Sequence, residues 1–418
     1  MKTNKLWHKD FSILVMGQIT SLFGKEMMLF ALPLYLLQLT GSASIFGIVL
    51  AVSLLPMIVL APIGGIVADR IHKKRIIVVL DFLTSGVVLA FLLLHNNMDG
   101  TGLILGTMVV LSGIQGLFAP TIQGLIPAMH EGGNLLKANA VVGQITAMAG
   151  LIGPILGGLL AGFFGIIPVL ILAGSAIFLS AVLECFMKIP HVKRPVTGTI
   201  LQLVKSELSE GLTFIRKEKP QLLKAGLVVS AFNLFVTSAL IIGLPVFTLQ
   251  LLGLSSQMFG IAKGVFMAGS LAGGILVGVL GAKLSMEKIH LVLIAASLMF
   301  VPMSAAFWIG LPPLVTFGII LASSFVFMAL ATLFSIRAIT FIQSETPPHL
   351  IGKVMAFIML LSLVAQPLGN AMYGVVFEQL SSHLGIVLLV IAYVGVQVAC
   401  GMYLVLRAVG EKRTKAVA

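Results

Sequence analysis

The strongest constraint on this chain is a series of about twelve apolar segments, each long enough to cross a lipid bilayer. A spanning helix needs roughly 20 mostly apolar residues, and backbone groups in hydrocarbon must find partners within the helix. The predicted spans are residues 11–38, 43–69, 75–95, 102–127, 139–163, 166–187, 221–250, 257–282, 288–309, 312–342, 352–377 and 384–407. The sequence therefore predicts an all-α polytopic membrane protein.

The composition agrees with this class and disfavours others. Of the 418 residues 59% are hydrophobic and only 10% are charged, which is too few charges for the surface of a soluble domain. The net charge of +12 would suggest nucleic-acid binding in a soluble protein, but here the bases lie in loops and form no cluster with aromatic residues. Cys185 and Cys400 predict no disulfide framework and no metal site. The apolar run after residue 10 is too long for a signal peptide and is predicted to be a retained first helix.

The loops between the spans alternate in charge. Every second loop contains Lys or Arg, whereas the others contain neither. The loops without Lys or Arg are residues 40–44, 96–101, 164–167, 253–256, 310–312 and 379–383. By the positive-inside rule, this alternation predicts that both termini are cytoplasmic, and it supports an even number of spans.

One long polar segment, residues 190–220, divides the chain. Its apolar and charged residues are spaced as in an amphipathic helix that lies on the inner membrane surface. The predicted domains are therefore an N-terminal six-helix half, residues 1–189, and a C-terminal six-helix half, residues 221–418. Residues 190–220 are the predicted cytoplasmic linker.

The two halves repeat each other weakly in sequence. Single matches of apolar letters mean little, but an offset held from the first helix pair to the fifth is hard to attribute to chance. Matching stretches include Leu32–Tyr35 with Leu244–Phe247, Phe46–Ile48 with Phe259–Ile261, and Pro154 with Pro367, all offset by 212 or 213 residues. The pattern predicts two six-helix units in parallel repeat.

A short charged turn joins the second and third predicted spans. Its pattern, Gly-x-x-x-Asp-Arg-x-x-Lys-Lys, resembles the signature loop of the major facilitator superfamily of transporters. The family usually has Gly where this chain has His72, which tolerates positive φ less readily than Gly. An ordinary basic cytoplasmic loop is the alternative. The resemblance implies a gating loop formed by Gly65, Asp69, Arg70, Lys74 and Arg75.

A glycine-rich motif lies in the fifth predicted span. Gly153, Pro154, Gly157 and Gly158 resemble the Gly-Pro-x-x-Gly-Gly motif of the exporting, antiporter branch of the superfamily. Glycines let a neighbouring helix approach closely, and proline removes a backbone donor and bends the helix. The motif is therefore predicted to be a helix-packing hinge, with plain tight packing as the alternative.

Further stretches resemble one subgroup of the superfamily, the macrolide-efflux-like and siderophore-exporter-like members. They include Gly17-Gln18, Ala119-Pro120, Gly352–Met355 and Gln366–Gly369, so the resemblance extends over nearly the whole chain. It implies a drug:proton antiporter that exports macrolide-like drugs or siderophores.

Two adjacent charges lie near the centre of the first predicted span. A charge there costs roughly 2.5–3.5 kcal/mol on insertion scales, so Lys25 and Glu26 need a polar cavity or partners. Proton coupling requires a group that can be either protonated or ionised. Burial favours the protonated form of a carboxyl group and a nearby cation favours the ionised form. Glu26 and Lys25 are therefore candidates for proton coupling. The alternative is a mutually neutralising structural pair.

Other charges within predicted spans are weaker candidates, among them Arg337 of the tenth span, which is expected to pair with Glu345 or to extend toward the membrane surface. Asp81 is the third coupling candidate, although its proximity in sequence to Arg75 favours a role in locking the charged turn. Glu184 lies near the end of the sixth span and is expected to reach water. Lys263, in the eighth span, has no evident partner in the sequence.

The predicted function is efflux of a hydrophobic or amphipathic small molecule by proton antiport, as in multidrug resistance. No enzyme constellation, phosphate-binding loop or metal spacing is present in the sequence, so no cofactor is expected. The expected protein is a monomer in the plasma membrane whose partners are a small molecule, protons and lipid. An importer on the same fold, or a membrane sensor or scaffold that transports nothing, remains the alternative.

Overall fold

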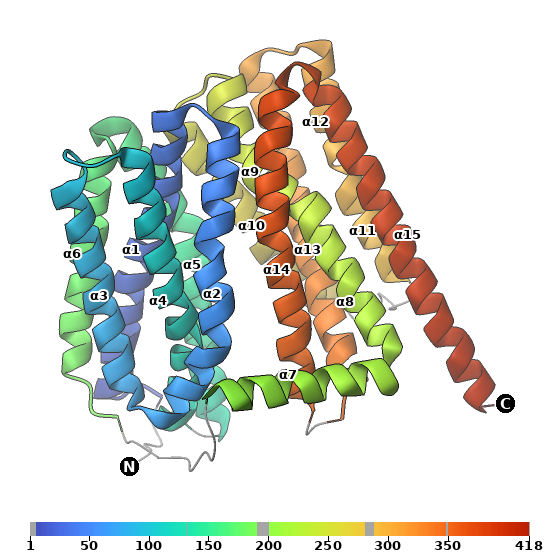
Figure 1. Ribbon diagram of the computed structural model, residues 1–418, viewed down its shortest axis with the longest axis horizontal. Helices are drawn as coiled ribbons and strands as arrows, with labels where there is room; N and C mark the ends of the chain where they lie inside the picture. The colour runs from blue at the N-terminus through green and yellow to red at the C-terminus, as the bar shows by residue number, and fades with distance from the viewer. Residues whose placement is uncertain (1–5, 131, 190–199, 281–287, 348–349, 418) are drawn as a thin grey trace. The chain divides into compact units, whose positions relative to one another are not determined.

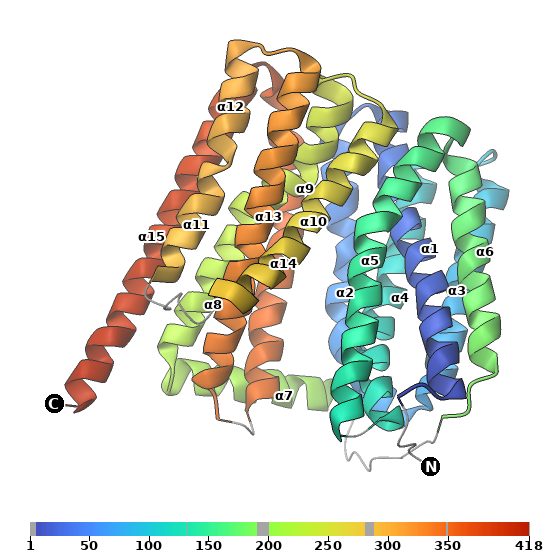
Figure 2. The ribbon, with the colours of Figure 1, turned by 180° about the vertical axis from the view of Figure 1, so that it is seen from behind.

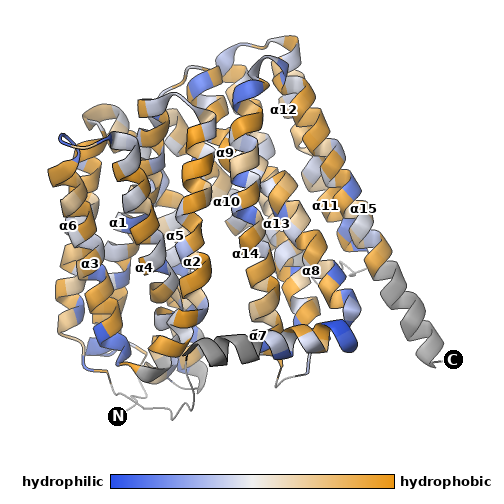
Figure 3. Cartoon of the chain, in the orientation of Figure 1, coloured by the Kyte–Doolittle hydropathy of each residue, from blue (hydrophilic) through white to orange (hydrophobic). Residues whose placement is uncertain are grey.

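The computed structural model describes residues 6–130, 132–189, 200–280, 288–347 and 350–417 (Figure 1). Within these residues the regular structure is entirely helical, and twelve segments are long and apolar enough to cross a membrane. This confirms the predicted all-α polytopic fold. Orange, apolar residues predominate along the long helices in Figure 3, as a lipid environment requires.

The first six spans are uninterrupted helices. They are α1 (Lys9–Thr40), α2 (Ala43–Arg70), α3 (Lys73–Leu94), α4 (Gly100–Met129), α5 (Gly132–Phe164) and α6 (Ile166–Cys185). Their connections are short, and Gly41 and Gly165 provide the left-handed φ values of +61° and +79° that two of these turns use.

Two of the later spans are interrupted, and a further helix, α7 (Ile200–Lys217), precedes them. The seventh span combines α8 (Pro220–Phe232), α9 (Ser238–Pro245) and two π-helical segments, η1 (Asn233–Thr237) and η2 (Val246–Leu251). The remaining spans are α10 (Ser256–Leu280), α11 (Ile289–Leu298) with α12 (Phe300–Ile309), α13 (Pro313–Ser344), α14 (Ile351–Gln379), and the short η4 (Ser381–His383) with α15 (Leu384–Val417).

The chain forms two compact units that do not follow chain order strictly. Unit 1 comprises Met1–Gly41, Val52–Val204 and Ser255–Gly264, and unit 2 comprises Ser42–Ala51, Lys205–Leu254 and Val265–Ala418. The two exchanged segments are the first ten residues or so of α2 and of α10, and Ser255 lies 213 residues after Ser42. The offset of the sequence repeat therefore reappears in the three-dimensional contacts. The predicted boundaries at residues 189 and 221 cut the chain into consecutive stretches of sequence. The compact units are instead defined by contacts, and each contains a segment from the other half of the chain.

Close glycine contacts accompany this exchange. In unit 2, a Cβ on Gly47 of α2 would lie 2.8 Å from Gly374 Cα of α14. In unit 1, a Cβ on Gly260 of α10 would lie 3.0 Å from Gly158 Cα of α5. Gly47 and Gly260 are partners in the predicted repeat. Both contacts bring backbones together as only glycine permits.

Within unit 1, α1 is the most enclosed helix. It packs against α4, α5 and α6, and α3 packs against α4 and α6 (Figure 2). Side chains from three neighbouring helices therefore surround α1, near whose middle the two charges lie.

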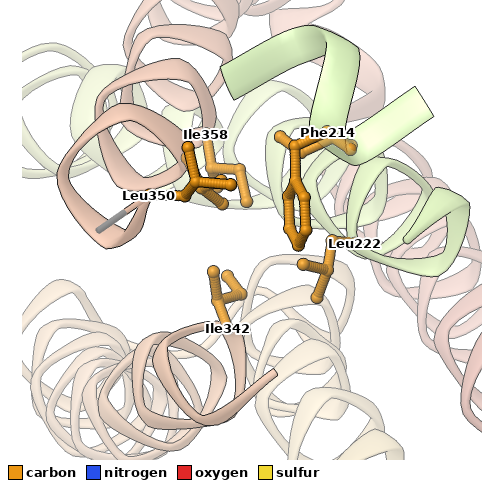
Figure 4. Close-up of a cluster of buried hydrophobic side chains, with 7 residues drawn as sticks. Phe214, Leu222, Ile342, Leu350 and Ile358 are labelled. Atoms are coloured by element: carbon orange, nitrogen blue, oxygen red, sulfur yellow. The ribbon is translucent and has the colours of Figure 1, made fainter. Parts of the chain in front are cut away.

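Unit 2 includes most of the linker helix. From Lys205 onward α7 belongs to unit 2, and it runs crosswise to α8 and α14 (Figure 1). An apolar cluster joins α7 to the ends of α8, α13 and α14 (Figure 4). Its buried members are Phe214, Ile215, Leu222, Ile342, Leu350, Val354 and Ile358.

The predicted amphipathic helix is thus present, but its surroundings differ in part from a bare membrane surface. Phe214 and Ile215, two apolar residues of this helix, are buried against protein. Two ion pairs border the cluster, Lys353 with Glu210 at 2.6 Å and Lys219 with Glu345 at 2.7 Å. The docked part of α7 is therefore held by unit 2 itself.

Candidate functional site

The charged turn between α2 and α3 is tighter than the sequence indicates. Helix α2 ends at Arg70 and α3 begins at Lys73, so only Ile71 and His72 lie between them. His72 has φ −61° and ψ 109°, which is extended backbone open to any residue. The turn therefore does not need the glycine that the family usually has there.

The predicted gating residues have different surroundings. Lys74 Nζ donates to the carbonyl oxygen of Cys185 at 2.7 Å, at the C-terminal end of α6, where the helix dipole favours a cation. Arg75 is exposed. Asp69 and Arg70 belong to α2, but their side chains lie outside the described part of the structure. Their gating role stays a prediction.

Gly65 has no close neighbour, whereas the preceding glycine does. A Cβ on Gly65 would meet no atom within 4 Å. A Cβ on Gly64 would lie 2.7 Å from the carbonyl oxygen of Gly116 on α4. The close helix contact at this end of α2 therefore depends on Gly64.

Lys25 is paired across unit 1 with Asp81. Its Nζ donates to Asp81 Oδ1 at 2.7 Å, and the two residues are only 4% and 0% exposed. Lys25 Nζ also lies 3.3 Å from the centroid of the Phe118 ring, a cation–π contact. Asp81 is therefore the ion-pair partner of Lys25 on α1. The expectation that it locks the charged turn was wrong, because its side chain is buried among α1, α3 and α4.

Glu184 is buried beside this pair, contrary to the expectation that it reaches water. It is 0% exposed, and Lys25, Asp81 and Gln18 are the groups that act on its carboxyl group. A Cβ on Gly17 would lie 3.1 Å from both Cγ and Oε1 of Glu184, so glycine at this position makes room for the carboxyl group. Three ionisable side chains thus meet between α1, α3 and α6.

Glu26 points in a different direction from Lys25, as the 100° step of an α-helix requires. It is partly buried and packs on α5, because a Cβ on Gly153 would lie 2.5 Å from Glu26 Cβ. The charged neighbour that acts on Glu26 is Lys263 of α10. Lys263 therefore has a charge partner, which the sequence did not reveal.

The glycine motif of α5 lies between α1 and the start of α10. On one side, a Cβ on Gly157 would lie 3.1 Å from Phe30 Cδ1 of α1. On the other, a Cβ on Gly158 would lie 2.7 Å from Gly260 Cα of α10. Through Gly153, Gly157 and Gly158, α5 thus packs closely on α1 and on the start of α10. The predicted packing contacts exist, and the hinge role of the motif and Pro154 stays a prediction.

A groove of about 560 Å³ lies elsewhere in unit 1, between α3 and α6. Its lining includes Phe82, Leu89, Leu92, Ile171 and Phe178 and contains no charged residue. Several of these side chains are exposed, so the groove belongs to the outer surface of the two helices. It is chemically suited to a hydrocarbon chain and contains none of the coupling candidates.

Sequence reasoning named Glu184 and Lys263 but gave both too little weight. Glu184 was placed too close to water because its position was judged from the end of its helix alone. Lys263 lies 237 residues after Glu26, so no local spacing connects them. The sequence repeat offered a clue, because it matches the start of α10 with the start of α2, and these are the two segments that pack away from the rest of their own half.

Comparison with known proteins identifies the family. The family model described as Major Facilitator Superfamily matches residues 14–370. Macrolide efflux protein A of Streptococcus pyogenes is 21% identical over 365 residues, covering 87% of this chain and 88% of that protein. Multidrug efflux pump Tap of Mycobacterium tuberculosis is 23% identical over 383 residues, covering 89% and 88%.

Solved structures show the same fold. The nucleoside transporter NupG superposes with a TM-score of 0.76 at 12% identity, covering 95% of this chain and 100% of that one. A D-xylose–proton symporter superposes with a TM-score of 0.71 at 14% identity, covering 94% and 97%. With twelve candidate spans, repeated halves and a family model that matches most of its length, the chain belongs to the Major Facilitator Superfamily of membrane transporters.

Proposed function

We propose that this transporter exports a hydrophobic or amphipathic small molecule in exchange for protons. The relatives named as macrolide and multidrug efflux proteins support export, and they match most of the chain. The observation that carries proton coupling is the position of Glu26, packed on the glycine motif of α5 and within the field of Lys263. Burial favours the protonated form of a membrane-embedded carboxyl group and a cationic neighbour favours its ionised form, so the two forms can be close in free energy.

Protonation of Glu26 would act on the packing of the helices around it. Ionised Glu26 attracts Lys263 and so draws α1 toward the start of α10. Protonated Glu26 loses this attraction, and Lys263 is left with an unbalanced charge in an apolar setting. The proton therefore favours one arrangement of α1, α5 and α10 over another, which is what coupling requires.

The proposed substrates are macrolide-like drugs or siderophores of apolar or amphipathic character. The chain contains 20 Met and 26 Phe residues, and flexible or aromatic side chains of this kind can adapt to ligands of varied shape. The proposed setting is the plasma membrane, with the protein a monomer and both termini in the cytoplasm. The Lys and Arg residues of alternate loops support this orientation.

An importer on the same fold is the second candidate. The solved structures with this fold include a D-xylose–proton symporter, so the fold is compatible with either direction. The Gly153–Gly158 stretch and the efflux relatives favour export. A sensor or scaffold would have no need of a charged pair such as Glu26 and Lys263 in its membrane region.

Transport by purified protein tests the proposal. Proteoliposomes of known orientation are loaded with radiolabelled erythromycin or with ethidium, and an inward proton gradient is imposed. We expect export of at least one probe together with alkalinisation of the external medium. Movement of the probe in the same direction as the protons would establish an importer. No movement of either probe with a correctly folded protein would refute the proposed substrate class.

A further inference from the structure

A second group of ionisable side chains lies in unit 1, away from Glu26. Lys25 of α1, Asp81 of α3 and Glu184 of α6 are 4%, 0% and 0% exposed. Together they comprise one ammonium group and two carboxyl groups. With both carboxyl groups ionised, the cluster would have a net charge of −1 and almost no contact with water.

The hydrogen bonds show how the charges are distributed. Asp81 Oδ1 accepts from Lys25 Nζ at 2.7 Å, so these two form the ion pair. Glu184 Oε1 and Oε2 are buried outside strict hydrogen-bond geometry with any donor, and the uncharged donor that acts on them is the side-chain amide of Gln18. An ionised Glu184 carboxylate would have only this neutral amide to solvate it, which is far more costly than burying a neutral carboxyl group.

The other charged groups near α6 do not supply the missing positive charge. Lys74 Nζ is bound to the carbonyl oxygen of Cys185 at 2.7 Å, and Asp10 Oδ1 accepts from the backbone N–H of Lys188 at 2.8 Å. Helix α5, which also packs on α6, contains Lys137 as its only charged residue, and Lys137 is exposed. Among the described residues, Lys25 is therefore the cation that acts on the cluster, and it is already paired with Asp81.

We propose that Lys25, Asp81 and Glu184 form a second proton-binding site, in which Glu184 holds the proton. Gly17 leaves space for the neutral carboxyl group, and Gln18 faces it. Glu184 is the residue before the end of α6 and Cys185 is exposed, so the path for proton exchange is short. If Glu26 carries the coupled proton, as in the proposed function, then α1 contributes one residue to each of two proton sites. These are the adjacent residues Lys25 and Glu26.

Infrared spectroscopy of the purified full-length protein at neutral pH tests this site without any transport assay. A protonated carboxyl group has a C=O stretching band that an ionised one lacks. We expect this band in the wild type, a loss of its Glu184 component in Glu184→Gln, and its retention in Glu26→Gln. Glu218→Gln, at an exposed position, is the matched control and should leave the band unchanged.

A second variant tests the charge count. Asp81→Asn removes the competing carboxylate, so Glu184 should ionise and become the partner of Lys25. The Glu184 band should then disappear although Glu184 is still present, a result that a purely structural role would not produce. A wild-type spectrum without the band, an unchanged band in Glu184→Gln, or a persistent Glu184 band in Asp81→Asn would overturn the proposal. Failure of the proposed function would instead appear as unaltered transport in Glu26→Gln.

Discussion

The buried pair of Lys25 and Asp81 gives a quantitative prediction about stability. Their Nζ and Oδ1 atoms are 2.7 Å apart, and the side chains are 5% and 0% exposed. Removing one partner of a buried pair usually costs about 3–5 kcal/mol, because the other charge is left uncompensated. We expect Lys25→Met to lower the free energy of unfolding by that amount, since it leaves two buried carboxyl groups without a cation.

Asp81→Asn should cost less, about 1–3 kcal/mol, because Glu184 can replace Asp81 as the partner of Lys25. The double variant Lys25→Met/Asp81→Asn leaves no buried charge in the pair. It should therefore lie within about 1 kcal/mol of the wild type, far from the sum of the single effects.

Reversible unfolding by SDS in mixed micelles measures these differences. Lys353 and Glu210 form the matched control pair, with Nζ and Oε2 2.6 Å apart but side chains 29% and 54% exposed. Removing either control residue should cost no more than about 1 kcal/mol. Additive losses at positions 25 and 81, or losses equal to those of the control pair, would refute the account of a buried, coupled pair.

Three further predictions concern other parts of unit 1. Gly153→Ala should displace Glu26 and strongly reduce proton-driven transport. Gly150→Ala is the control, because its added Cβ meets no atom within 4 Å and transport should be unchanged. Equal transport in both variants would contradict this prediction. Burial and the neighbouring His8 lower the pKa of His130 from its usual 6.5, so the unfolded chain binds the proton more readily and stability should fall as pH drops below about 6.5. Thermal unfolding from pH 8 to 5 should show this loss in the wild type and a smaller one in His130→Phe. Asp69→Asn should reduce transport without unfolding the protein, as measured by flux at normal expression, and unchanged flux would remove Asp69 from the gate.

The fold was largely predictable because the bilayer leaves few alternatives. Apolar length located all twelve spans, and the repeat matched Gly47 with Gly260, which make corresponding close contacts in the structure. The π-helical segments η1 and η2 were not predictable in this way. Hydropathy does not distinguish an i→i−5 hydrogen bond, such as Leu252 N–H to the carbonyl oxygen of Phe247, from the usual i→i−4 bond.

The candidate site was predicted only in part. The sequence identified Glu26, Lys25 and Asp81 as unusual charges because charges are costly in a membrane. It paired them by proximity along the chain, whereas the structure pairs Lys25 with Asp81 and brings Lys263 to Glu26. Such partners depend on which helix faces pack together, and a single sequence specifies the apolar faces of a membrane helix poorly because lipid and protein are equally apolar.

The most direct test of the central claim uses inverted membrane vesicles containing the wild type or Glu26→Gln, with erythromycin or ethidium as the probe. Uptake is measured twice, once under a proton gradient and once as exchange against unlabelled probe without a gradient, with Glu218→Gln as the control. If Glu26 carries the coupled proton, Glu26→Gln loses gradient-driven uptake and retains exchange, because an amide keeps the shape of the protonated carboxyl group. Full gradient-driven uptake by Glu26→Gln would contradict the account.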